Sequence, residues 1–130
     1  MKKLMIALAA LVMVGMSFTG CKVERSEVTV SVYDKEDNPI ADRYVLYTDM
    51  ASAIIDAVAP SPESLVSGIP DGWSGGQTNK QGYVTFKFDL AVSKLAYYFY
   101  VYDDGSKQWE DKTITIERGK NAEITFVVNK

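Results

Sequence analysis

Alternation of apolar and polar residues with a period of two constrains the fold of this chain more than any other feature. The segment 27–33 reads EVTVSVY and the segment 82–89 reads GYVTFKFD, so every second side chain is a valine or a phenylalanine. Because the side chains of a β-strand point alternately to its two faces, each segment is predicted to be a strand with one buried face. Further strands are predicted at 43–48, 96–103, 109–117 and 122–129. Six short strands separated by polar turns predict an all-β sandwich.

The segment 96–103, AYYFYVYD, is apolar on both faces and is therefore predicted to be a central, covered strand. One face carries Tyr97, Phe99 and Val101, and the other carries Tyr98, Tyr100 and Tyr102. We expect the less polar set in the core between the two sheets, which turns the second set outward.

The segment 49–77 is too long for an ordinary loop between two strands, and we interpret it as a helical insertion. Residues 50–58 carry apolar side chains at helical spacing, and Pro60 ends this pattern. Ser61, with a proline and an acid after it, predicts the start of a second short helix that runs to about Ser67. Residues 70–76 (PDGWSGG) are expected to form a flexible loop that presents Trp73.

The first residues have the layout of a secretory signal peptide. Two lysines follow Met1, residues 4–18 are uncharged and largely apolar, and Thr19 and Gly20 precede Cys21. An uncleaved membrane anchor is the alternative, because the charge-free stretch is near the lower limit for spanning a bilayer. Either interpretation places the remaining residues outside the cytoplasm.

This segment resembles the signal peptide of bacterial lipoproteins, which ends in small residues followed by cysteine. The resemblance implies that residues 1–20 are removed, that Cys21 is acylated and that residues 21–26 tether a domain of residues 27–130. The protein would then bind a membrane through the lipid on Cys21. Lys22 stands where an aspartate would signal inner-membrane retention, which favours the outer membrane of a Gram-negative cell. The periplasmic and surface-exposed sides both stay open.

Two turn motifs resemble those of transthyretin-like, carboxypeptidase-regulatory-like sandwich domains. The first is an acid-rich turn that ends in Asn38-Pro39-Ile40, and the second is Thr78-Asn79-Lys80-Gln81-Gly82-Tyr83. Proline fixes φ in the first motif, and Gly82 suits a turn position with positive φ. The resemblance implies a seven-stranded Greek-key sandwich that serves as a non-catalytic accessory or binding module. An immunoglobulin-like sandwich is the alternative.

Composition excludes several classes of function. The chain has no histidine and one cysteine, so it has no histidine general base, no internal disulfide and no four-ligand zinc site. Its net charge is −3, which argues against a nucleic-acid partner. We expect no cofactor, no metal and no enzymatic activity.

Two groups of acidic residues are candidates for reactive or metal-binding sites. Four acids flank one predicted turn: Asp103, Asp104, Glu110 and Asp111. We expect them to be solvated and ionised rather than catalytic, because acid–base catalysis needs one carboxyl in a buried environment. The oxygen-rich segment 34–38 lacks the glycine and distal glutamate of a calcium loop, so we expect a turn closed by its own side chains.

The candidate ligand-binding residues are the aromatic side chains Trp73, Tyr98, Tyr100 and Tyr102. The three tyrosines form an outward ladder that suits a sugar or an extended peptide, and Trp73 would close over it. The alternative is that the insertion covers this face with its apolar residues: Ile54, Ile55, Val58, Leu65, Val66 and Ile69.

The predicted function is a non-catalytic envelope lipoprotein that serves as an extracytoplasmic binding or adhesion module, with a glycan or a protein as the ligand. Two alternatives belong to other classes: a structural subunit of a larger envelope assembly, and a small carboxylate-dependent hydrolase.

Overall fold

The computed structural model describes residues 25–50 and 55–130. The predictions for the signal peptide, for Cys21 and for Ile54 lie outside these residues. Within them the chain forms seven strands and two single helical turns: β1 (Ser26–Tyr33), β2 (Tyr44–Thr48), α2 (Ile55–Val58), η1 (Pro62–Leu65), β3 (Ser74–Gln77), β4 (Tyr83–Phe88), β5 (Lys94–Asp103), β6 (Gln108–Glu117) and β7 (Ala122–Val127). No helix in the described part is long and apolar enough to cross a membrane.

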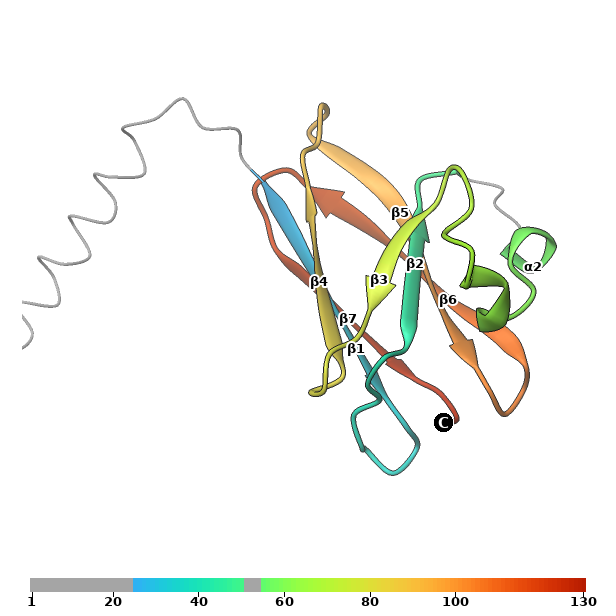
Figure 1. Cartoon of the computed structure of the whole chain (residues 1–130). Coiled ribbons are helices and arrows are strands. Elements are labelled where there is room, and N and C mark those ends of the chain that lie inside the picture. The colour runs from blue at the N-terminus through green and yellow to red at the C-terminus, as the bar shows by residue number, and fades with distance from the viewer. Residues whose placement is uncertain (1–24, 51–54) are drawn as a thin grey trace, which may run out of the picture.

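The strands form two sheets that pack face to face, which confirms the predicted β-sandwich (Figure 1). One sheet has the order β4-β1-β7, and the other has the order β3-β2-β5-β6. β1 runs antiparallel to β4 and parallel to β7, whereas the pairs of the second sheet are antiparallel. Neighbouring strands in the sequence lie mostly in different sheets, so the chain closes the core by crossing repeatedly between them.

The core between the sheets consists of the alternating residues that the sequence pattern singles out. Val28, Val30 and Val32 of β1 are fully buried, and Phe99 and Phe126 are the largest fully buried side chains. The same cluster contains further predicted inward residues: Phe86, Phe88, Val101, Ile116, Ile124 and Val128. Burying one face of each strand supplies the main driving force for packing the sheets.

Strand β3 corrects the expectation of a flexible loop at 70–76. Ser74–Gln77 pairs antiparallel with β2, with Ser74 opposite Tyr47 and Gln77 opposite Tyr44. A side chain at position 75 would place its Cβ 2.3 Å from the Val45 carbonyl oxygen, so glycine is required for the close approach of the two backbones. The glycines that suggested flexibility therefore permit strand pairing.

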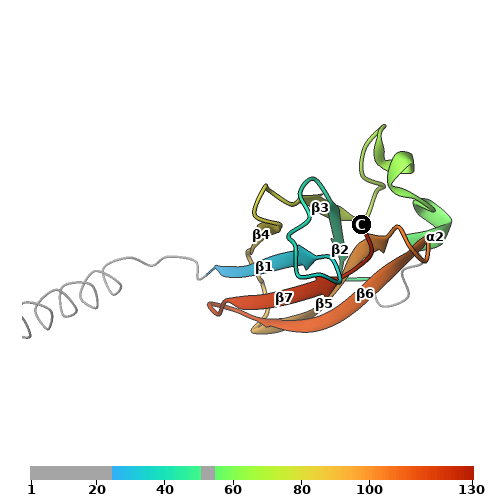
Figure 2. The ribbon, with the colours of Figure 1, turned by 90° about the horizontal axis from the view of Figure 1, so that it is seen from below.

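The second helical element of the insertion is shorter than expected. The described residues of the insertion form one α-helical turn, Ile55–Val58, and one 3₁₀ turn, Pro62–Leu65, which ends before Ser67. Ser61 precedes this turn in an extended conformation and makes no side-chain cap hydrogen bond. Figure 2 shows α2 beside the end of β6, so the insertion lies against the outside of the four-stranded sheet.

The two turn motifs adopt the predicted geometry. Asp34 Oδ1 accepts hydrogen bonds from the backbone amides of Glu36 and Asn38, both at 2.9 Å. The hydrogen bond from Asn38 is the main reason that the pKa of Asp34 is lowered. Gly82 has φ of +84°, and a Cβ there would lie 2.7 Å from the Cβ of Pro39. The two motifs thus pack against each other at one end of the sandwich.

Candidate functional site

The outward tyrosine ladder is where the sequence predicts it, on the outer face of β5, but it is covered. Tyr100 and Tyr102 are 9% and 7% exposed, and Tyr98 is half-buried. The ring of Trp73 lies 5.2 Å from that of Tyr100 in an edge-to-face arrangement. Burial, followed by the negative charge of Asp111, raises the pKa of Tyr100.

The insertion provides the cover, as the alternative interpretation predicts. Ile55, Ala59 and Leu65 are buried against the ladder, and Ile69 is partly buried there. The indole Nε1 of Trp109 donates a hydrogen bond of 2.7 Å to the carbonyl oxygen of Ala59. This buried bond holds the insertion against β6.

Two apolar residues of the insertion depart from this expectation. Val58 is 48% exposed and Val66 is 86% exposed, so neither contributes to the cover. Val58 is the last residue of α2, and Val66 follows the last residue of η1. The described part of each helical element is one turn, which can direct few side chains toward the sheet.

The expected exposure of Trp73 is wrong. The side chain is 8% exposed and packs in one cluster with Tyr100 and with Ile55 and Leu65 of the two helical turns. The pairing of β3 with β2 and the hydrogen bond of 2.9 Å from Thr48 Oγ1 to the Gly72 carbonyl oxygen bring the loop down onto the sheet. A ligand that bound Trp73 and the three tyrosines would have to displace the insertion, and their role in binding stays a prediction.

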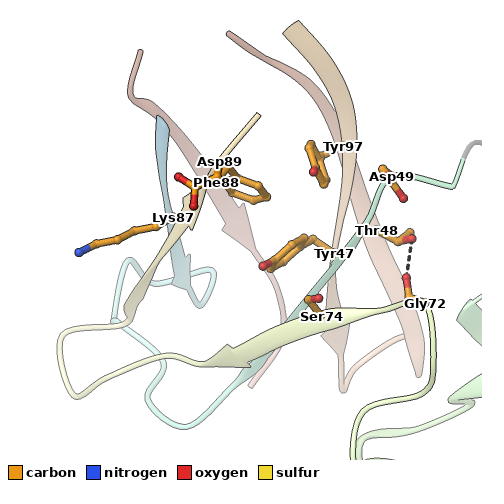
Figure 3. A pocket seen from close by; sticks show the side chains of 9 residues that line it. All are labelled: Tyr47, Thr48, Asp49, Gly72, Ser74, Lys87, Phe88, Asp89 and Tyr97. Atoms are coloured by element: carbon orange, nitrogen blue, oxygen red, sulfur yellow. Dashed lines mark hydrogen bonds between the residues drawn. The ribbon is translucent and has the colours of Figure 1, made fainter. Parts of the chain in front are cut away.

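An open pocket of about 280 Å³ lies elsewhere, at the end of the sandwich where β2 and β4 finish and β3 and β5 begin (Figure 3). We call it the end pocket. Its lining combines aromatic, hydroxyl and charged side chains from both sheets: Tyr47, Thr48, Asp49, Gly72, Ser74, Lys87, Phe88, Asp89 and Tyr97.

Three aromatic rings form the apolar part of the end pocket. The ring centre of Phe88 lies 5.0 Å from that of Tyr47 and 4.7 Å from that of Tyr97, and the two tyrosine rings are 6.0 Å apart. The rings come from β2, β4 and β5, so packing of the two sheets holds them in place.

Polar groups lie beside these rings. One side-chain hydrogen bond joins two of the nine lining residues: Thr48 Oγ1 donates to the Gly72 carbonyl oxygen (Figure 3). Burial raises the pKa of Tyr97, and the negative charge of Asp49 adds to this effect. The hydroxyl of Tyr97 therefore stays protonated at neutral pH as a hydrogen-bond donor.

The residues of the end pocket were missed as a site by sequence reasoning. Alternation predicts Tyr97 in the core, which is correct, but it says nothing of a gap at the end of the sandwich. Tyr47 and Asp49 lie 50 and 48 positions from Tyr97 in the sequence, and their proximity depends on the pairing of β2 with β5. The sequence signal that could have indicated this site is the acid directly after two strand ends: Asp49 follows β2, and Asp89 follows β4.

The acids around the turn at 103–111 are not equivalent, which corrects the expectation that all are solvated. Asp103 is 5% exposed, and its Oδ1 accepts hydrogen bonds from the amides of Gly105 and Ser106 and from Nδ2 of Asn129. Burial raises the pKa of Asp103, but these bonds more than offset it and leave the pKa lowered. Asp103 is thus an ionised structural acceptor. The described residues contain no cluster of three metal-ligating side chains.

Comparison with known proteins identifies the fold. No family model and no curated protein matches the chain. The chain is similar to a streptococcal ancillary pilin, with a TM-score of 0.54 and 16% identity over 84% of this chain and 33% of the pilin.

Two other similar structures have lower TM-scores. The TIE protein of Bacillus anthracis has a TM-score of 0.48 and 16% identity over 82% of this chain and 16% of that protein. The major pilin subunit of Bacillus cereus has a TM-score of 0.45 and 8% identity over 82% of this chain and 30% of the pilin. The chain spans a third or less of the length of these three proteins. The likeness to the ancillary pilin shows that the two share a β-sandwich fold.

Proposed function

We propose that this chain is a non-catalytic module of the cell envelope, anchored to a membrane by lipid on Cys21, that binds a ligand through its sandwich. The observation that carries the proposal is the short distance in sequence between the signal motif and the folded domain. β1 begins at Ser26, five positions after Cys21. Ser26 is fully buried and donates a hydrogen bond of 2.6 Å to the Glu117 carbonyl oxygen. A sandwich that starts so soon after a lipidated Cys21 would be held close to the membrane.

The end pocket supports ligand binding as the role of the domain. It lies at the end of the sandwich where β1 begins, because Asp89 of its lining forms an ion pair with Arg25 at 3.0 Å. Five residues span at most about 18 Å. The pocket would therefore face the region close to the membrane, and Lys22 after Cys21 favours the outer membrane.

Lipid attachment at Cys21 predicts a defined mass for the protein extracted from membranes. We expect intact-mass spectrometry to show loss of residues 1–20 and the addition of acyl chains, because several chains are needed for stable anchoring. Cys21→Ser is expected to abolish the acyl mass and the processing, whereas the neighbouring Lys22→Ala keeps both. A protein that retains residues 1–20, or that carries an unmodified Cys21, would contradict the proposal.

A structural subunit is the second candidate function, favoured by the position of the C-terminal strand. β7 lies at the edge of its sheet, where a partner strand could pair with it. Lys112 of β6 covers part of this edge. Its Nζ donates a hydrogen bond of 2.6 Å to the Thr125 carbonyl oxygen and lies 5.6 Å from the ring centre of Phe126.

Removal of the Lys112 side chain is expected to promote self-association. Lys112→Ala frees the Thr125 carbonyl and removes a charge from the edge, so light scattering should show a mass that rises with concentration. Lys107→Ala, in the turn before β6, is the matched control and should behave as the wild type. Stable oligomers of the wild-type protein would favour the structural subunit, and a monomer throughout favours the binding module.

A further inference from the structure

The end pocket has the dimensions of a site for one small ligand. Its volume of about 280 Å³ lies just below the range of about 300–1,000 Å³ that is usual for drug-sized ligands. Rings from both sheets form its wall, so the pocket is preformed by the packing of the core. The covered ladder on the other side of β5 offers no comparable opening, because Tyr100 and Tyr102 are buried there.

The accessible lining of the pocket is mostly polar, and it suits an uncharged ligand with many hydroxyl groups. The rings of Tyr47 and Tyr97 are partly exposed and can contact the C–H groups of a sugar ring, whereas Phe88 is buried and packs against both rings. Asp49 contributes a carboxylate that accepts hydrogen bonds, and Ser74 a hydroxyl that both donates and accepts. In Figure 3 these polar groups are not bonded to one another and so stay available to a ligand.

The charges around the pocket disfavour an anionic ligand. Lys87 points away from the rings (Figure 3), its side chain is 65% exposed, and its Nζ lies 4.0 Å from Glu27 Oε1. Asp89 is paired with Arg25 at the rim. The charge next to Tyr97 is that of Asp49, which is negative and would repel a phosphate or a carboxylate.

We infer that the end pocket binds one neutral pyranose unit of a glycan, with the rings of Tyr47 and Tyr97 against its apolar face and Asp49 accepting hydrogen bonds from its hydroxyl groups. This inference rests on the proposed binding function and moves the ligand site from Trp73 and the tyrosine ladder to the opposite face of β5. The hydroxyl of Tyr97 supplies a donor to a ring or hydroxyl oxygen of the sugar.

Ligand-observed NMR on the full chain tests the inference directly. The protein is kept in a detergent without a sugar headgroup, and the probes are the methyl glycosides of glucose, galactose, mannose and N-acetylglucosamine. We expect saturation transfer to at least one of them, with a dissociation constant on the order of 1 mM, as is consistent with a small open site.

Two conservative variants locate the site without disturbing the core. Asp49→Asn removes a charged acceptor and should weaken binding about tenfold, and Tyr97→Phe should weaken it about fivefold. The matched controls are Asp56→Asn in α2 and Tyr83→Phe on the outer face of β4, both exposed and outside the pocket, which should bind as the wild type does.

The outcomes separate this inference from the function on which it rests. The inference is overturned if no glycoside binds at about 50 mM, or if binding is unchanged in both pocket variants. It is also overturned if acetate or inorganic phosphate binds more tightly than any glycoside. None of these results would alter the mass and membrane location of the lipidated protein, which test the anchored module independently.

Discussion

Replacing Trp109 by alanine is expected to lower the free energy of unfolding by about 3–5 kcal/mol and to release the insertion from the tyrosine ladder. The side chain of Trp109 is 8% exposed, and its ring lies 5.3 Å from that of Tyr102. Its Nε1–H also makes the buried hydrogen bond to the Ala59 carbonyl oxygen. Truncation therefore removes both a large buried surface and the bond that fixes the insertion.

Urea unfolding measures the first effect and Trp73 fluorescence measures the second. Trp73 is the remaining tryptophan in this variant, and its emission should shift to the red because the helical turns α2 and η1 no longer shield it. Trp109→Phe keeps most of the packing and loses the hydrogen bond, so a smaller loss of about 1–2 kcal/mol is expected. An unchanged emission of Trp73 in the alanine variant would show that Trp109 does not hold the insertion.

Replacing Asp103 by alanine is expected to destabilise the fold by about 2–4 kcal/mol. The substitution leaves the amides of Gly105 and Ser106 and the side-chain amide of Asn129 without their charged acceptor. These bonds join the β5–β6 turn to the end of the chain after β7. Asp104→Ala is the matched control: its carboxylate is about half exposed and pairs with Arg43, so about 0–1 kcal/mol is expected.

The pH dependence of stability provides a second measurement on Asp103. Its pKa is lower in the folded state than the ordinary value of 3.8, so it contributes stability that is fully present above that value. This contribution is lost as the pH falls through the folded-state pKa. Asp103→Asn cannot ionise, and its deficit relative to the wild type should shrink between about pH 6 and about pH 2. A constant deficit over this range would show that the charge of Asp103 has no role.

The sequence by itself determined the faces of the strands. Val28, Val30 and Val32 are buried as their alternation requires, because a period of two leaves each strand one way to bury its apolar side chains. The conformations of the turns also depend on nearby residues: Asp34 accepts hydrogen bonds from the amides two and four residues ahead, and Gly82 adopts positive φ. Such features depend on a few neighbouring residues, so local chemistry specifies them.

Only the tertiary structure decided the location of the candidate site. Gly75 and Gly76 look flexible in the sequence, yet the backbone of β2 approaches so closely that only glycine fits at position 75. This pairing places Trp73 on Tyr100 and closes the ladder. The end pocket arises where residues from β2, β4 and β5 meet after the two sheets have packed. Contacts between segments distant in the chain depend on the packing of the whole sandwich, and no local pattern encodes them.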